Sequence, residues 1–366
     1  MYYFILNPQA SSGKGVAVWG KLKPILKERN VPYCLAVFNR REDVSMFVKA
    51  LTSEKEPKLS KLLLTADKMS EINGEFEYDE VHIVVLGGDG TINLVFNSVV
   101  DLKRTKLSCI RVGSGNDFAR NLGVYKKPET AFIHLLDEPE EMVLDYGEVS
   151  FTPDAAFNEV NDVVLKEQRF GADADRADKS FSGMGKVNDT SPERTRRFII
   201  SSGIGYDADI CEEVSRSKLK KILNYIHSGK LVYTAIGIRQ IFNKDRARVK
   251  LYLDDNEPIR IGSLMFAVAM IHEKEGGGVP FCPHADATDG QLELCIVKNA
   301  PTPKLLLEVA MVYIRKHILF SNVREMRCKR LHISADRPQW LHTDGETPCK
   351  VKEAVLTCRK GLNFVK

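Results

Sequence analysis

The chain has 366 residues, of which 43% are hydrophobic and 28% are charged, and its 53 basic and 49 acidic residues leave a net charge of +4. A chain of this length buries a large core and favours two domains over one. The small net charge gives no reason to expect a nucleic-acid partner. The most apolar run, residues 264–271, is far shorter than the roughly 20 residues that span a bilayer.

The cysteines and the N-terminus indicate the compartment. The 8 cysteines are scattered without a C-x-x-C pair, so we expect reduced thiols and no structural zinc. The opening residues, MYYFILNP, lack a basic leader followed by an apolar segment and a cleavage site, which argues against a secretory signal. We therefore expect a cytoplasmic protein whose contact with a membrane is peripheral.

The first part of the chain alternates strands with helices. The residue pattern predicts strands at 2–6, 33–38, 82–86 and 108–112, and helices at about 14–29, 42–51, 91–100 and 117–122. This order predicts a three-layer α/β domain with a parallel sheet over residues 1–145, whose ligand lies at the carboxyl ends of the strands. The mostly polar residues 52–80 are interpreted as an elaboration.

The second part changes character. Short β-like runs at 196–207, 247–255, 262–271, 290–298 and 330–336 are separated by turn residues, with one helix at about 216–242. We predict an antiparallel β-sandwich domain over residues 146–349, with a mobile excursion at 153–195 and a tail, about 350–366, that returns to the first domain. The edge strands of this domain could pair with those of a second subunit, so a homodimer is possible.

A glycine-rich loop, Gly87-Gly88-Asp89-Gly90-Thr91, joins the strand at 82–86 to the next helix. Glycines let a phosphate approach the backbone, and the helix N-terminus attracts its negative charge. Asp89 would repel that phosphate unless a divalent cation lay between them, so the loop predicts Mg²⁺ with a nucleotide. The alternative is an ordinary strand-to-helix turn with a capping aspartate.

Two further loops follow parallel strands. Residues 7–15, NPQASSGKG, resemble a Walker A loop only superficially, because the first glycine and the final Ser or Thr are missing. Residues 113–117, GSGND, repeat the combination of glycines and short polar side chains before a helix. The chain also lacks a G-x-G-x-x-G after a strand, which disfavours dinucleotide binding of the Rossmann type. Three such loops on one sheet edge predict a single nucleotide site.

These motifs together resemble the diacylglycerol kinase catalytic-domain family, which includes bacterial lipid kinases and sphingosine kinases. The motifs are N-P-x-x-S-x-G-K-G, G-G-D-G-T and G-S-G-N-D-F-A-R, followed by Gly276-Gly277-Gly278, Pro283-x-Ala285-x-x-x-Asp289-Gly290-x-Leu292 and Asp344-Gly345-Glu346. The resemblance implies an ATP-dependent lipid kinase with the nucleotide between the two domains. It implies that Asp89 binds Mg-ATP and that the nucleotide is lined by Asn7, Ser11, Gly87, Gly88, Gly90, Thr91, Gly113, Ser114, Gly115 and Asn116.

The resemblance also implies the general base. The glutamate of D-G-E is Glu346, while a rival assignment gives the role to Asp89. We favour Glu346, because a carboxylate neutralised by a metal is a weak base. Without the family, D-G predicts only a tight turn between strands. His342, two residues before Asp344, is expected at the surface, and the alternative is that it tunes or substitutes for Glu346.

Bacterial members of the family use a structural Mg²⁺ in the second domain, which the resemblance places near Asp289. His284 stands where an acidic ligand is common, and Asp286 is the substitute that we consider. A second departure is His272, where the family usually has Asn.

A basic segment suggests how a lipid is reached. Residues 216–250 carry ten basic residues and one acidic residue, and residues 316–330 add further cations. A basic amphipathic helix can lie on an anionic membrane surface, although its apolar stripe can equally pack on the sandwich.

We therefore expect transfer of phosphate from ATP to diacylglycerol or a related lipid alcohol. The alternatives are an NAD kinase-like phosphotransferase, which shares G-G-D-G-T, and a catalytically silent regulator that binds lipid or nucleotide.

Overall fold

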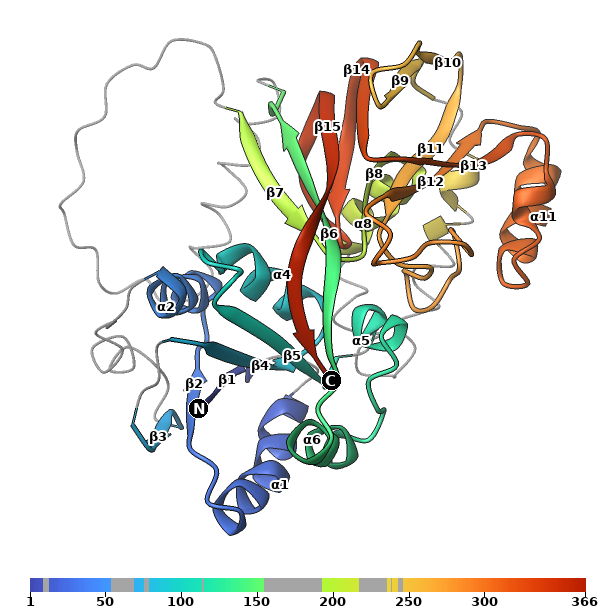
Figure 1. Ribbon diagram of the computed structural model, residues 1–366. Coiled ribbons are helices and arrows are strands. Elements are labelled where there is room, and N and C mark those ends of the chain that lie inside the picture. The colour runs from blue at the N-terminus through green and yellow to red at the C-terminus, as the bar shows by residue number, and fades with distance from the viewer. Residues whose placement is uncertain are drawn as a thin grey trace, which may run out of the picture.

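The computed structural model describes residues 1–8, 13–53, 69–75, 79–113, 115–154, 193–216, 236–237, 239–242 and 246–366. Figure 1 shows an α/β part that contains the N-terminus and a β-rich part above it. Two long strands, β6 and β15, run from one part to the other.

The first sheet is parallel and has the order β5-β4-β1-β2. Its strands are rich in β-branched and aromatic residues and are almost entirely buried, as expected of a parallel sheet covered on both faces. A short strand, β3, adds antiparallel to the edge at β2. The strands are β1 (Tyr2–Leu6), β2 (Tyr33–Val37), β3 (Glu71–Asn73), β4 (Val81–Gly87) and β5 (Thr105–Arg111).

Helices cover both faces of this sheet. α1 (Lys14–Glu28) packs beside α6 (Pro128–Asp137) on one face, and α2 (Arg41–Ser53) packs beside α4 (Asp89–Ser98) on the other. The short helix α5 (Asp117–Asn121) follows β5. Because α4 and α2 lie on the face toward the β-rich part, the loop before α4 opens toward that part (Figure 1).

The two parts share strands. β6 (Glu141–Phe151) pairs antiparallel with β15 (Glu346–Val365) along its whole length. At its end β15 pairs parallel with β5 through Asn363 and Phe364, whose aromatic ring packs edge-on against Phe118. The last strand of the chain thus belongs to the first sheet as well as to the second part.

The second part is antiparallel, and one of its strands, β14 (Arg330–Thr343), pairs with different strands along its length. The first half of β14 pairs with β9, whereas its last residues pair with β8. The register against β15 shifts between Ser334 and Gln339, the kind of irregularity that lets a strand turn a corner in a sandwich. The other elements are β7 (Arg194–Phe198), β8 (Ser201–Gly205), α8 (Tyr206–Arg216), β9 (Val249–Leu253), β10 (Ile259–Ile261), β11 (Leu264–Met270), β12 (Leu292–Lys298), α11 (Thr302–Val312), η2 (His317–Leu319) and β13 (Val323–Cys328).

The predicted fold class is confirmed: a parallel α/β domain is followed by an antiparallel sandwich-like domain. Some boundaries differ. The run predicted as one strand at 196–207 is divided into β7 and β8, and helix α8 begins at Tyr206, ten residues before the predicted helix. Most of that predicted helix, and most of the excursion at 153–195, lie outside the described residues. Within the described part of the chain, no helix is both long enough and apolar enough to cross a membrane.

Candidate active site

The loop after β4 presents Asp89 at the first position of α4. Gly88 caps this helix, and its carbonyl accepts hydrogen bonds from the N–H groups of Thr91 (2.9 Å) and Ile92 (3.1 Å). The Asp89 carboxylate does not cap its own helix. Its Oδ1 accepts a hydrogen bond from the backbone N–H of Phe118 in α5 (3.1 Å), so the capping role that we considered belongs to the neighbouring helix.

Glycines allow the loops after β4 and β5 to touch. A Cβ on Gly113 would lie 2.5 Å from Gly88 Cα, and a Cβ on Gly115 would lie 2.9 Å from Asp89 Oδ2. Neither position has room for a side chain. Asn116 closes this loop: it adopts a left-handed conformation (φ 52°), and its side-chain N–H donates to Gly113 O at 2.5 Å.

The loop after β1 lies at the same sheet edge, because β1 is the neighbour of β4. A Cβ on Gly15 would lie 2.5 Å from Leu6 Cδ1, so glycine lets α1 start close against the strand. Asn7 is half-buried at the end of β1. The predicted ligands Ser11 and Ser114 lie outside the described residues, and their roles stay predictions.

Burial and charge set the ionisation of Asp89. Its pKa is raised to about 6, first by burial and then by the negative charge of Asp117, against hydrogen bonds from the N–H groups of Asp117 and Phe118. An acid in such a place gains from a cation beside it, because the cation would favour the ionised form.

Asp344 and Gly345 form the two-residue turn between β14 and β15. Both have positive φ, 49° and 79°, as a type I′ hairpin requires, and Thr343 pairs with Glu346 across the turn. The tight turn predicted by D-G is therefore present, and it also carries the predicted base. The Asp344 carboxylate accepts N–H bonds from residues 199–201 (2.8–3.0 Å) and from Asn93 of α4 (2.6 Å), which ties the turn to the α/β domain.

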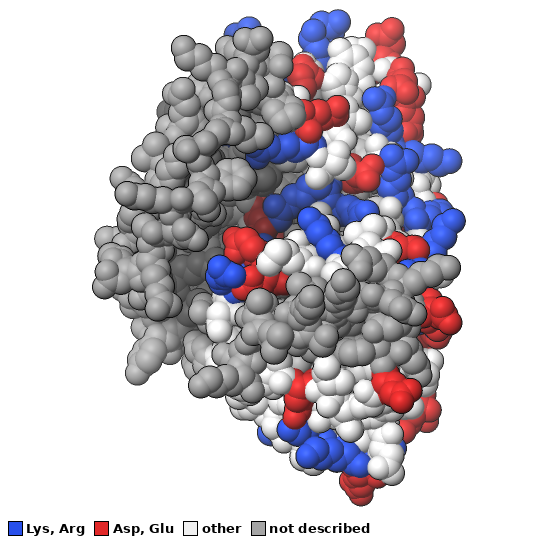
Figure 2. All heavy atoms as spheres, turned by 90° about the vertical axis from the view of Figure 1, so that its left-hand side faces the viewer, with Lys and Arg blue, Asp and Glu red and all other residues white. Residues whose placement is uncertain are grey.

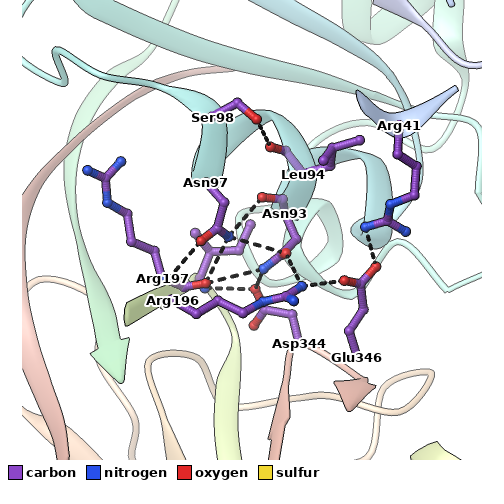
Figure 3. Close-up of polar contacts among 10 residues, drawn as sticks. Arg41, Asn93, Leu94, Asn97, Ser98, Arg196, Arg197, Asp344 and Glu346 are labelled. Carbon is purple, nitrogen blue, oxygen red and sulfur yellow. Dashed lines mark hydrogen bonds and ion pairs between the residues drawn. The ribbon is translucent and has the colours of Figure 1, made fainter. Parts of the chain in front are cut away.

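Glu346 is held between two arginines (Figure 3). Arg41, at the start of α2, donates to Oε1 at 2.7 Å, and Arg196 of β7 is paired with Oε2. A Cβ on Gly90 would lie 3.7 Å from Oε1, so Glu346 borders the loop that carries Asp89. Burial would raise the pKa of Glu346, but the positive charges of Arg41 and Arg196 together outweigh burial and lower it.

Asparagines on α4, which sequence analysis missed, join the two domains. Asn97 exchanges hydrogen bonds with the backbone of Arg197 (2.8 and 2.9 Å), and Asn93 accepts one from Arg196 Nη2 (3.0 Å). Figure 3 shows these side chains pointing from the helix toward β7 and the turn. Two asparagines four residues apart, among the apolar residues Ile92, Leu94, Val95 and Phe96, were the available signal, because such a pair shares one face of a helix.

The three-glycine loop docks onto α5. Gly277 N–H donates to Asp117 Oδ2 at 2.6 Å, and Asn121 Nδ2 donates to Lys274 O at 2.8 Å. All three glycines, Gly276–Gly278, have positive φ. A Cβ on Gly278 would lie 2.7 Å from Arg120 Nη1. The loop therefore favours glycine because of its positive φ angles.

The proposed structural metal ligands lie in one exposed loop. Asp286 Oδ1 accepts hydrogen bonds from Thr288, and Asp289 Oδ1 accepts one from Gln291 N–H. The neighbouring Asp145, which sequence analysis missed, accepts a 2.5 Å bond from Gly290 N–H, and burial raises its pKa. His284 pairs with Glu325 (2.6 Å). The Mg²⁺ site at Asp286 and Asp289 stays a prediction.

His342 was expected at the surface, and this is wrong: it is 1% exposed. Its Nε2 lies 2.8 Å from Asp207 Oδ2 at the start of α8, and Glu275 is the third member of the cluster. Burial would lower the pKa of His342, but Asp207 and Glu275 overcome it and raise the value to about 9. The pKa of Glu275 is raised to about 7, mainly by burial. A protonated His342 thus balances these acids and holds α8 against β14.

The face that carries α2 and β7 is hollowed, and Lys and Arg side chains gather beside the hollow (Figure 2). Strand β7 carries three arginines in its five residues, and one of them, Arg196, pairs with Glu346. Positive charge beside a glycine-lined edge favours an anionic ligand such as a phosphate.

This combination of a parallel α/β domain, an antiparallel sandwich and a glycine-lined edge between them defines the class of fold. Residues 1–149 match the diacylglycerol kinase catalytic domain, and residues 200–362 match the YegS C-terminal NAD kinase beta sandwich-like domain. The resemblance recognised in the motifs is confirmed: the first domain of the chain is a diacylglycerol kinase catalytic domain by this match, and the second is similar to the YegS C-terminal domain.

Individual relatives support this assignment. The chain is 21% identical over 345 residues to "Putative lipid kinase YtlR" of Bacillus subtilis, covering 94% of this chain and 93% of the relative. It is 24% identical over 265 residues to a Bacillus subtilis diacylglycerol kinase, covering 72% and 70%. A crystal structure of a "putative diacylglycerol kinase" from Bacillus anthracis str. Sterne has the same fold, with a TM-score of 0.67 at 17% identity, over 99% of this chain and 94% of that one.

Proposed function

We propose that the protein is an ATP- and Mg²⁺-dependent lipid kinase, which transfers the γ-phosphoryl group to the hydroxyl of diacylglycerol or a related lipid alcohol and gives a phosphatidic acid-type product. The observation that carries the proposal is that two carboxylates from different domains, Asp89 and Glu346, lie near the same loop at the carboxyl-end edge of the parallel sheet. Asp89 lies among glycines that touch one another, and Glu346 reaches the same loop from the other domain.

The residues present fit a nucleotide. Glycines 87, 88, 90, 113 and 115 leave backbone groups open to phosphate oxygens, and Asn7, Thr91 and Asn116 add polar side chains beside them. The Oδ1 atom of Asn116 is buried and has no hydrogen-bond partner among the described residues. A buried acceptor of this kind is costly unless a bound group donates to it.

Asp89 is the residue that would hold the cation of Mg-ATP. Oxygen ligands suit Mg²⁺, and burial together with the negative charge of Asp117 raises the pKa of Asp89, so a bound cation would stabilise its ionised form. When bound, Mg-ATP supplies the phosphoryl group and spreads its negative charge.

Glu346 would accept the proton of the lipid hydroxyl. In the same step, the hydroxyl oxygen attacks the γ-phosphorus of ATP, and ADP leaves. In-line transfer of this kind needs no covalent enzyme intermediate. Because Arg41 and Arg196 lower its pKa, Glu346 becomes a better base when one of them moves away. We infer that an incoming phosphate draws the guanidinium groups from Glu346, so that the same residues neutralise the transferred group and release the base. The rival base is Asp89, whose pKa of about 6 also suits proton transfer.

A lipid acceptor implies that the enzyme contacts a membrane peripherally. Anionic headgroups would attract the basic residues of the chain. NAD kinase-like transfer is the weaker alternative, because residues 1–149 match the diacylglycerol kinase catalytic domain. A catalytically silent regulator is also weaker, because both Asp89 and Glu346 are present at the same edge.

The test is phosphate transfer from labelled ATP with Mg²⁺ to a panel of diacylglycerol, sphingoid bases, phosphatidylglycerol and NAD. We expect a labelled lipid whose formation stops when EDTA removes the cation. Transfer to NAD alone would contradict the lipid assignment, and no transfer to any acceptor would favour a regulator.

A further inference from the structure

Helix α11 and the turn η2 expose an unusual number of large apolar side chains. The exposed fractions are 52% for Leu307, 60% for Tyr313, 57% for Ile314 and 76% for Leu319, and Leu306 is exposed as well. These are five of the thirteen exposed large hydrophobic residues in the described part of the chain, and they fall within residues 306–319. Single exposed apolar residues are ordinary, whereas a cluster marks an interaction surface. We call these five residues the α11 patch.

The patch adds a second apolar face to a helix that is already packed. Leu305 and the partly buried Val309 pack into the core beneath α11, and Val312 is buried as well. Leu306, Leu307 and Ala310 are exposed, so the apolar surface of α11 continues around the helix from the buried face to the side that the core leaves uncovered. A helix that is apolar on both sides is expected to be covered on both sides, and Figure 1 shows α11 at the outer edge of the second domain, beyond β13.

The charges around the patch are positive. Lys304, Arg315 and Lys316 lie within or beside it, and the only acid between residues 299 and 324 is Glu308. Glu308 is buried and accepts a hydrogen bond from Asn322 (3.1 Å), so it does not neutralise the surface. Glu273, from another loop, pairs with Arg315, so the half-buried Lys304 and the exposed Lys316 carry the remaining positive charge.

These charges distinguish between two candidate partners of the α11 patch, a second copy of the chain and an anionic membrane. A second copy of the chain would bring the same lysines against each other, because a twofold interface pairs a surface with itself. An anionic bilayer instead offers acyl chains to the leucines, headgroup charge to the lysines and an interface suited to the tyrosine ring.

The patch is also close to the second domain's helix α8. Tyr206, the first residue of α8, and Leu305 of α11 belong to one core that covers strands β11 and β12. The Arg315–Glu273 pair connects the patch to the loop that docks on α5. A membrane bound at α11 would thus be attached to the elements that border the proposed site.

We propose that the α11 patch inserts into the interfacial layer of an anionic membrane and holds the enzyme there. The biological use of this contact rests on the proposed lipid kinase function, but binding itself does not require catalysis.

The test is sedimentation of the full chain with sucrose-loaded vesicles, either of phosphatidylcholine alone or of phosphatidylcholine with phosphatidylglycerol. We expect tighter binding to the anionic vesicles. Leu307→Glu should weaken it about tenfold or more, since burying one leucine stabilises by at least about 1.5 kcal/mol. Lys316→Gln should weaken only the binding to anionic vesicles, by about fivefold. The matched control is Val143→Glu, which alters a 61% exposed valine on β6 and should bind as the wild type does.

Equal vesicle binding by Leu307→Glu and the wild type would overturn the proposal, as would a wild type that binds no vesicles. If Leu307→Glu instead converts a dimer to a monomer in light scattering, the patch is a subunit interface and the proposal is wrong. Activity on a short-chain, water-soluble diacylglycerol should be unchanged in Leu307→Glu. A protein that binds vesicles through α11 but phosphorylates no lipid would refute the proposed function and leave this inference standing.

Discussion

The two carboxylates of the candidate site lie in opposite electrostatic environments. Asp89 sits on the α/β domain among glycines and backbone N–H groups, and burial raises its pKa to about 6. Glu346 sits on a hairpin of the second domain between two guanidinium groups, which lower its pKa. Neighbouring acids with pKa values moved in opposite directions can take different roles. In the proposed reaction, Asp89 becomes stabilised when Mg²⁺ binds beside it. Glu346 becomes a stronger base when the guanidinium group of Arg41 or Arg196 moves away.

The largest effect is expected at Asp89. Asp89→Asn keeps the acceptor for Phe118 N–H but removes the charge, so activity should fall about 1,000-fold through loss of metal-bound nucleotide. Titration calorimetry should show weakened Mg-ATP binding. Asp137→Asn, at an exposed ion pair with Arg29, is the control and should retain activity. A fully active Asp89→Asn enzyme would exclude both roles considered for this acid.

A smaller effect is expected at Glu346. Glu346→Gln should lower kcat about 100-fold, the contribution of a general base, while ATP binding stays nearly unchanged. Glu353→Gln, an exposed position on the same strand, is the control. If Glu346→Gln turns over normally while Asp89→Asn binds Mg-ATP but does not turn over, the base is Asp89.

Two adjacent arginines, Arg196 and Arg197, separate an effect on catalysis from an effect on stability. Arg196→Gln should lower kcat about tenfold and move the acidic limb of the pH–rate profile to higher pH, because removing the positive charge raises the pKa of Glu346. Arg197 instead donates to Val99 O (2.8 Å) and lies over the Phe96 ring. Arg197→Gln should therefore lower the melting temperature and leave the profile in place. An unmoved profile in Arg196→Gln would remove the link between this arginine and the base.

The smallest effect on catalysis is expected at the buried His342 cluster, where stability should depend on pH. The folded pKa of His342 is raised to about 9, so its stabilising contribution is complete below its unfolded value near 6.5 and is lost as pH rises through 9. Glu275, raised to about 7, acts in the same direction between its ordinary value of 4.5 and 7. Chemical unfolding should show a loss on the order of 4 kcal/mol between pH 6 and 9. His342→Gln should flatten this decline, and an unchanged slope would show that other groups cause it.

Sequence reasoning succeeded where local backbone requirements are strict. The glycines of residues 87–90 and 113–115 lie where two loops touch, and Asp344-Gly345 forms the hairpin turn that its residues favour. It failed where a side chain depends on distant partners. His342 next to a turn gave no sign of Asp207, and Arg41 gave no sign of Glu346, 305 residues away.

The sequence by itself determined the alternation of strands and helices, the glycine-lined loops and the family, because hydrophobic periodicity and glycine conformation are local properties of the chain. Only the tertiary structure decided which charges surround each acid. The pKa values of Asp89 and Glu346 depend on burial and on groups from other elements, and the exposure of the α11 patch depends on which face of the helix the core covers. Electrostatic and packing energies follow distance in space, and residue order alone does not contain that distance.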